Sequence, residues 1–279
     1  MMRPNVSRVW VLLALCLSLV APSRAGAQSK PAEDDSAELA KKLSNPISDL
    51  VSVPFQFNWE QKVGTSELSR FTLNVQPVIP FTLSKDWNLI LRVIAPFVGQ
   101  PPLVTGGGPA FGMGDLTPSF FFSPALKGGL TIGVGPVFGL PSTYDPRIGS
   151  GKWSAGPTAV ALQQTGPLTV GVLVNQLWSY AGDPTRADVN QMFLQPFLSY
   201  QATKTITLTV QSETTANWDA APGQRWTVPI NFLIAKLSTF GTFPASYQLG
   251  YGVFPWHPDI GPSWKVRAAI VILLPRKQK

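Results

Sequence analysis

The only histidine of this 279-residue chain is the first candidate for acid–base chemistry. His257 lies in a segment rich in Pro and Gly, and Ser263 follows it closely. A Ser–His pair is the pattern of a nucleophilic hydrolase, in which the imidazole takes the proton of the hydroxyl. Here both residues fall in one expected loop, without the spaced Ser–His pattern on strands that barrel lipid hydrolases show. We therefore expect no enzyme, and a surface lipid hydrolase around His257 and Ser263 is the minor alternative.

The sequence contains no pattern of residues that would bind a metal ion or a phosphate group. The single cysteine, Cys16, lies in the apolar N-terminal run, and the acidic residues are scattered without ligand spacing. We expect these acids to end strands in turns: Asp115, Asp145, Asp183, Asp188 and Asp219. The run of glycines at 106–108 lacks the Lys-Ser/Thr ending and the following helix of a phosphate loop. We expect no metal and no cofactor.

A set of polar side chains is more informative, because it recurs at every second residue of long segments. It contains five cations and one acid that opposes them, together with four amides. If these segments are strands, the whole set shares one face: Arg70, Asn74, Gln76, Arg92, Asn175, Glu213, Arg225, Asn231, Lys265 and Arg267. Interior cations would favour anionic or polar solutes, as rings of Arg and Lys do in pores. The equal alternative is that they pair with Glu213 or loop acids and brace the structure.

The N-terminus carries the three regions of a secretory signal peptide. Arg3 and Arg8 precede an apolar run at residues 9–20, and Ala25-Gly26-Ala27 fits the small-x-small cleavage rule. The run is too short to cross a bilayer as a helix, which needs about 20 apolar residues. We expect export, with cleavage after Ala27 removing residues 1–27.

Alternation of apolar and polar residues dominates the chain beyond residue 50. Between the leader and the strands, residues 28–48 form a periplasmic segment in which residues 37–43 are expected to be a short helix ending before Asn45-Pro46. The later blocks are about ten residues long, as in residues 70–81 and 225–236. Such blocks match the 9 to 11 residues that a tilted strand needs to cross a bilayer.

Three features favour a membrane barrel over a soluble sandwich. The wet faces carry Thr, Asn, Gln and Ser rather than Lys and Glu, and only 13% of the chain is charged. Trp and Tyr recur near block ends, as interfacial girdles require. Short and long links alternate, which is the asymmetry of periplasmic turns and extracellular loops. The net charge of +7 comes largely from the leader and the tail, and without a basic stripe it predicts no nucleic-acid partner.

The sequence thus predicts an all-β fold, an antiparallel transmembrane β-barrel of about twelve strands with a short N-terminal helix. The barrel spans residues 49–275 and a basic tail follows at 276–279. Its strands are expected at 49–60, 69–82, 87–98, 115–123, 129–140, 153–163, 167–180, 190–201, 205–216, 225–237, 244–254 and 263–274. The links at 99–114 and 141–152 are long enough to fold inward and set the bore.

Prolines inside these strands oppose the prediction, since each removes a ladder donor and a closed barrel has no edge. We expect bulges or bends at these positions: Pro54, Pro77, Pro96, Pro118, Pro136, Pro157, Pro196 and Pro229.

Several segments resemble a family of uncharacterised bacterial outer-membrane transporters grouped with the phenol meta-pathway proteins. They are residues 43–56 (LSNPISDLVSVPFQ), 73–80 (LNVQPVIP), 86–90 (DWNLI), 114–116 (GDL), 119–124 (SFFFSP), 133–136 (GVGP), 193–200 (FLQPFLSY) and 226–231 (WTVPIN). The resemblance covers most of residues 38–275. It implies an outer-membrane location and passage of small molecules, including aromatic or poorly soluble ones. The chain departs from the usual terminal aromatic residue, because a basic tail follows Leu274-Pro275.

The resulting prediction is an outer-membrane pore or transporter for small solutes. Its expected partners are outer-membrane lipid, an unidentified solute and the barrel-assembly machinery. The alternative is a non-conducting envelope barrel with a structural or binding role.

Overall fold

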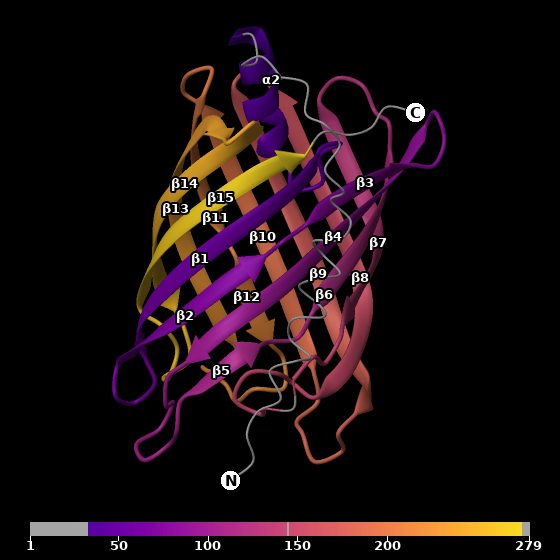
Figure 1. Cartoon of the computed structure of the whole chain (residues 1–279). Helices are drawn as coiled ribbons and strands as arrows, with labels where there is room; N and C mark the ends of the chain where they lie inside the picture. The colour runs from indigo at the N-terminus through magenta and orange to yellow at the C-terminus, as the bar shows by residue number, and fades with distance from the viewer. Residues whose placement is uncertain (1–32, 144, 275–279) are drawn as a thin grey trace. The chain divides into compact units, whose positions relative to one another are not determined.

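The computed structural model describes residues 33–143 and 145–274. One helix and fifteen strand segments are seen in this part of the chain (Figure 1). The elements are α2 (Glu33–Leu43), β1 (Val51–Val63), β2 (Leu68–Val75), β3 (Val78–Thr82), β4 (Trp87–Gln100), β5 (Ala110–Met113), β6 (Thr117–Pro124), β7 (Leu130–Gly139), β8 (Lys152–Thr165), β9 (Leu168–Gly182), β10 (Asn190–Gln201), β11 (Ile206–Ser212), β12 (Thr214–Asn217), β13 (Trp226–Phe240), β14 (Phe243–Trp256) and β15 (Trp264–Leu274).

The strands close into one antiparallel barrel. β15 pairs with β1, and β9 pairs with β10, so that the sheet returns on itself. Three wall strands are each broken into two segments, namely β2 with β3, β5 with β6, and β11 with β12, and the barrel therefore has twelve wall strands. The twelve-strand prediction is confirmed. Closure satisfies the backbone of every wall strand without a free edge.

The expected strand limits agree with the structure to within a few residues at most ends. Two links were predicted wrongly. Within 99–114, β4 continues to Gln100 and Ala110–Met113 pairs with it as β5. The link expected at 238–243 is the two-residue turn Gly241-Thr242, because β13 and β14 pair as far as Phe240 and Phe243. The helix begins earlier than expected, at Glu33, and ends at Leu43 as expected. The predicted leader (1–27) and basic tail (276–279) lie outside the described residues.

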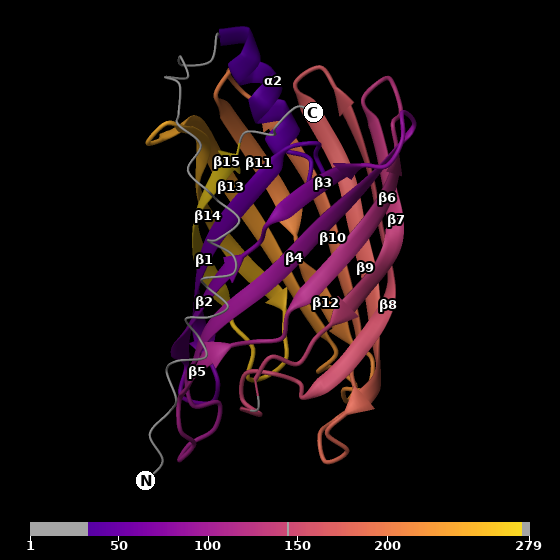
Figure 2. The same ribbon diagram turned by 45° about the vertical axis from the view of Figure 1, so that its right-hand side comes forward.

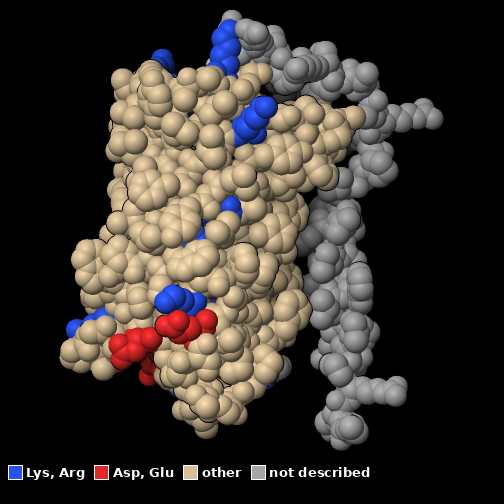
Figure 3. All heavy atoms as spheres, turned by 90° about the vertical axis from the view of Figure 1, so that its left-hand side faces the viewer, with Lys and Arg blue, Asp and Glu red and all other residues tan. Residues whose placement is uncertain are grey.

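The two faces of the wall differ as the alternation predicts. Large apolar side chains of one phase stay exposed on the outside, such as Phe232 (52%) and Leu249 (62%). Exposed aromatic side chains lie near strand ends, among them Trp87, Trp178, Tyr200, Trp226 and Trp256. Figure 3 shows that charged side chains on the face turned to the viewer lie mainly toward the two ends of the barrel. An apolar belt between aromatic girdles is the outer surface that lipid contacts.

The links sort by length onto the two ends of the barrel. β1 begins, β15 ends and α2 lies at one end, here called the short-turn end, where the links at 83–86, 166–167 and 241–242 also lie (Figures 1 and 2). The opposite, long-loop end carries the links at 101–109, 140–151 and 183–189. Among the described residues, no helix has the length and apolarity needed to span a bilayer.

Most of the in-strand prolines interrupt the ladder on one side only, while Pro77 and Pro229 have no ladder partner on either side. Pro54 pairs with Val271 of β15, while the ladder toward β2 and β3 is broken between Ser52 and Phe55. Pro196 pairs with Val172 of β9, and pairing on its other side stops at Leu194 and resumes at Phe197. An antiparallel residue directs its N–H to one neighbour, so a proline costs one donor on that side alone.

The remaining prolines fall at comparable defects. Pro229 lies at a register shift between β13 and β14, as a bulge would place it, and Pro77 lies in the break between β2 and β3. Pro96 faces the gap between β5 and β6, and Pro157 faces an interruption of the β8–β9 ladder. The predicted local defects are therefore present, although most are one-sided breaks rather than bulges with a shifted register.

Part of the lumen is filled by an apolar cluster around Ile47, which lies between α2 and β1. Ile47 is 2% exposed, and its neighbours come from five different wall strands. We call this cluster the Ile47 socket: Val78, Ile90, Phe121, Val160 and Leu173, with Phe193 packed against it. Gly133 of β7 leaves the space that Ile47 occupies, because a Cβ there would lie 2.9 Å from Ile47 Cδ1. The socket anchors the N-terminal segment inside the barrel.

We expect Gly133→Ala to displace Ile47 and loosen this anchor. The new Cβ would also lie 3.1 Å from Phe121 Cβ, so the residues around it have little room to move. Overpacking of this kind costs about 1–3 kcal/mol. Trypsin cleavage at Lys41 and Lys42 of the purified protein should become faster, as followed by mass spectrometry. Gly99→Ala is the matched control, because its Cβ would meet neighbours at an ordinary 3.6 Å. Equal cleavage in both variants would contradict the anchor.

Candidate functional site

A buried charge cluster joins two parts of the wall that are separated by β13 and β14. Glu213, between β11 and β12, accepts hydrogen bonds from both terminal nitrogens of Arg267 on β15, at 2.9 and 2.5 Å. Lys265 Nζ lies 3.2 Å from Glu213 Oε2 and 5.3 Å from the ring centroid of Phe254. Arg267 Nε also donates to Asn58 Oδ1 at 2.8 Å. The forked Arg–carboxylate geometry fixes Glu213, and with it the break between β11 and β12, to β15.

Two of the predicted cations lie elsewhere than expected. Arg70 does not face Glu213, because the register places Glu60 of β1 directly opposite it, and its Nε lies 2.6 Å from Glu60 Oε2. Arg225 precedes β13 at the long-loop end, is exposed, and donates to the carbonyl oxygen of Ala220 at 3.0 Å. Glu213, the expected chief counter-ion, pairs directly with Lys265 and Arg267, whereas Arg70 pairs with Glu60 and Arg225 lies in a link.

Arg92 of β4 differs from the other cations near the cavity. Its Nη2 donates to Gln76 Oε1 at 3.0 Å, and Gln76 Nε2 in turn donates to Gln56 Oε1 at 3.3 Å. No carboxylate lies within salt-bridge distance of Arg92 among the described residues. Glu213 acts on Arg92 electrostatically from beyond salt-bridge distance, and the hydrogen-bond partner of the guanidinium is a neutral amide.

The three predicted asparagines lie at separate places on the wall. Asn74 is directly opposite Gln56 in the β1–β2 register, and Asn175 is opposite Thr158 and Phe193. Asn231 is 1% exposed, and neither of its amide atoms has a hydrogen-bond partner. The three do not form a single cluster.

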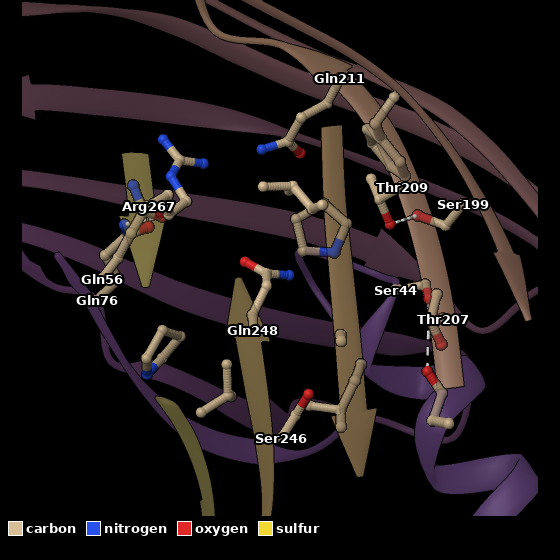
Figure 4. Close-up of a pocket in the computed structure, with 18 of the residues that line it drawn as sticks. Ser44, Gln56, Gln76, Ser199, Thr207, Thr209, Gln211, Ser246, Gln248 and Arg267 are labelled. Carbon is tan, nitrogen blue, oxygen red and sulfur yellow. Dashed lines mark hydrogen bonds between the residues drawn. The ribbon is translucent and has the colours of Figure 1, made fainter. Parts of the chain in front are cut away.

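A cavity of about 190 Å³ lies beside the charge cluster. Figure 4 shows labelled polar side chains around this cavity, including Gln211, Gln248 and Arg267. Other parts of the lining are apolar, with Phe197, Leu233 and Leu237 among them. The polar residues that line it are Ser44, Gln56, Gln76, Arg92, Gln195, Ser199, Thr205, Thr207, Thr209, Gln211, Glu213, Ser246, Gln248 and Arg267.

The N-terminal segment forms one end of this cavity. Ala40, Leu43 and Pro46 contribute to the lining. Gln164 and Gln201, at the short-turn ends of β8 and β10, each donate to a backbone carbonyl of α2 at 2.9 Å. Polar contacts to two wall strands and the Ile47 socket therefore hold the segment across the short-turn end of the lumen.

The link at 140–151 narrows the other end. Ile148 lies against the inner side of β5, where a Cβ added to Gly112 would meet Ile148 Cδ1 at 3.3 Å. Ser150 donates through its backbone N–H to Asp115 Oδ2 at 2.8 Å, which ties this link to the residues between β5 and β6. The expectation that it folds inward thus agrees with the structure.

A further pair of side chains ties the links to one another. Arg147 Nη1 donates to the carbonyl oxygen of Pro109 at 2.9 Å, and its Nη2 lies 2.6 Å from Asp145 Oδ2. Hydrogen bonds from Arg147 lower the pKa of Asp145 from 3.8 to about 2. The Asp145–Arg147 pair therefore keeps its charge over most of the acidic range.

Sequence reasoning missed several members of the site. Asn58 and Glu60 share the alternation phase of β1 with Gln56, but only the register brings them to Arg267 and Arg70. Gln195, Gln211 and Gln248 also fit the period-two pattern and could have been listed by phase alone. Ile47 carried no signal, because a single apolar residue in a polar segment does not indicate which surface will bury it.

A closed, twelve-strand antiparallel wall with an apolar exterior and a polar lumen defines the outer-membrane class of β-barrel. Among solved structures, an outer-membrane channel from Pseudomonas putida F1 matches with a TM-score of 0.64 and 14% sequence identity, covering 91% of this chain and 100% of that one. The NanC porin matches with a TM-score of 0.52 and 10% identity, covering 81% of this chain and 100% of the porin. No family model matches the sequence, and no curated protein matches it. These similarities show the fold.

We expect Glu213→Gln to destabilise the barrel, because it leaves Arg267 and Lys265 buried without a carboxylate. Breaking a buried ion pair by removing one partner costs about 3–5 kcal/mol. The temperature at which the folded band on an unboiled gel is lost should therefore fall. Glu67→Gln is the control, since Glu67 forms an exposed pair with Lys62. If both variants lose the folded band at the wild-type temperature, the bracing role of Glu213 is refuted.

The Asp145–Arg147 pair predicts how the loops respond to acid. The folded pKa lies below the ordinary 3.8, so the pair is intact at neutral pH and at pH 4, and is lost as the pH falls through about 2. A spin label at Thr105→Cys, in the exposed 101–109 link, should gain mobility only in that window. In Arg147→Ala the same label should be mobile at every pH. A label at Ala221→Cys, in the 218–225 link, is the control and should show no such step.

Proposed function

We propose that this chain is an outer-membrane channel for small solutes. The observation that carries the proposal is the cavity of about 190 Å³ inside a closed barrel. Its lining is rich in polar side chains, although the wall strands already pair through their backbones. A barrel of about twelve strands leaves a narrow lumen, between the packed eight-strand and the open sixteen-strand cases. The similarity to an outer-membrane channel supports the same function.

The proposed path is narrow and is controlled by the N-terminal segment. The Ile47 socket fills one part of the lumen, so solutes pass along the other part, between the glutamines and Phe197, Leu233 and Leu237. Because α2 and Ile47 close the short-turn end, release of this segment widens the exit. By the rule that short turns face the periplasm, that end is the periplasmic one.

The remaining parts of the proposal concern family, partners and chemistry. The quoted segments support placement with the outer-membrane transporters grouped with phenol meta-pathway proteins. Outer-membrane lipid covers the apolar belt, and the barrel-assembly machinery inserts the exported chain. A role as a lipid hydrolase has little support, since His257 Nδ1 lies 2.8 Å from the carbonyl oxygen of Pro258. No hydrogen bond joins His257 to Ser263 among the described residues.

The proposal predicts that Ile47→Ala raises solute flux. Loss of a buried Ile side chain costs about 2–5 kcal/mol, which favours the released segment by more than about tenfold. Liposome swelling with small sugars and amino acids, and conductance in planar bilayers, should both increase over wild type. Ile234→Ala makes the same change on the outer surface, where Ile234 is 49% exposed, and should leave flux unaltered.

Two results would count against the channel. If neither the wild type nor Ile47→Ala admits any solute, the non-conducting barrel is the better description. If Ile234→Ala raises flux as much as Ile47→Ala, the change reports general loosening of the wall rather than release of the segment.

A further inference from the structure

The charge balance beside the cavity leaves one cation without an acid. Three cations, Arg92, Lys265 and Arg267, stand against one carboxylate, Glu213. Both oxygens of Glu213 are occupied, because Oε1 accepts from Arg267 and Gln211, and Oε2 accepts from Arg267 and Lys265. Glu60, the other lumen acid of the cluster, is occupied by Arg70. Arg92 therefore forms no direct ion pair among the described residues, and the charge of Glu213 reaches it only at longer range.

An unpaired cation inside a membrane barrel is expensive unless a ligand or water solvates it. Arg92 lines the cavity, and the one hydrogen bond of its guanidinium within the described residues goes to Gln76. The planar fork of a guanidinium matches a carboxylate through two parallel hydrogen bonds. Arg92 therefore presents free donors of the right geometry to the cavity.

The rest of the cavity indicates the body of the ligand. Glutamine side chains on β1, β10, β11 and β14 supply amide donors and acceptors, and Gln195 Oε1 is buried without a partner. Phe197, Leu233 and Leu237 supply an apolar surface. A volume of about 190 Å³ equals about six water molecules at ~30 Å³ each, which suits a small organic molecule rather than an oligomer.

We propose that Arg92 is the anion-binding centre of a site for small amphipathic monocarboxylates. The carboxylate lies on the Arg92 guanidinium, and the apolar body of the solute lies along Phe197 and Leu233. The proposal rests on the proposed channel function, for which it names the class of solute. Gln76 and Gln56 act as positioning residues, because they hold the guanidinium toward the cavity through consecutive hydrogen bonds.

The first test compares benzoate with its neutral analogue benzamide. Isothermal titration calorimetry on the full mature protein in detergent, at pH 7 and low salt, should show benzoate binding at least about tenfold more tightly than benzamide. Raising the salt concentration should weaken binding of benzoate only. Equal affinity for the two probes would overturn the proposal, and this comparison needs no variant.

The second test changes the cation. Arg92→Gln should lower the affinity for benzoate by at least about tenfold, and Arg92→Lys should recover part of it, since Lys keeps the charge but not the fork. Arg225→Gln removes the same charge at the exposed long-loop end and should bind benzoate as the wild type does. The gel-mobility shift on boiling verifies that each variant is folded. Undiminished benzoate binding by folded Arg92→Gln would show that the proposal is wrong.

Measuring both benzoate binding and solute flux distinguishes failure of the carboxylate site from failure of the proposed channel function. Benzoate binding without any flux in liposomes would refute the channel and keep the site. Equal flux of benzoate and benzamide, with no preference in calorimetry, would keep the channel and refute the site.

Discussion

The constraint on which the structure depends is that no backbone polar group of the wall can be left without a partner in lipid. Closure of the sheet through the β9–β10 and β15–β1 ladders meets it, since every wall strand then has two neighbours. Closure also sorts the side chains, because alternate residues must face lipid or lumen. The prolines are compatible with this constraint because most break the ladder on one side and stay paired on the other, as Pro54 and Pro196 do. The wall is therefore locally weakened but not opened.

A lumen enclosed in this way must be filled or solvated, and the chain does both. One part is packed by the Ile47 socket, for which Gly133 leaves space. The other part is polar and holds the cavity beside Glu213. The N-terminal segment belongs to both parts, since Ile47 enters the socket while Leu43 and Pro46 line the cavity. Movement of that segment would therefore change packing and bore together, which is why a single anchor residue can control the proposed path.

The lumen charges combine bracing with recognition. Glu213 ties the break between β11 and β12 to β15 through Arg267 and Lys265, and this use of cations is structural. Arg92 takes no part in that pairing and lines the cavity with an amide, Gln76, as its hydrogen-bond partner. The alternatives left open by the sequence, bracing or solute preference, therefore apply to different residues. A fixed electrostatic frame beside one free guanidinium is an arrangement suited to selecting small anions in a narrow bore.

The sequence by itself determined the class of fold, because period-two alternation, block length and link asymmetry are local properties that survive without contacts. It located the wall strands, the short helix and some of the polar residues that line the cavity. Only the tertiary structure decided which of these residues meet. Arg70 faces Glu60 instead of Glu213 because strand register assigns partners, and Arg267 meets Asn58 because closure of the sheet pairs β15 with β1. The burial of Ile47 was likewise undecidable from sequence, since its socket is assembled from strands that are distant along the chain.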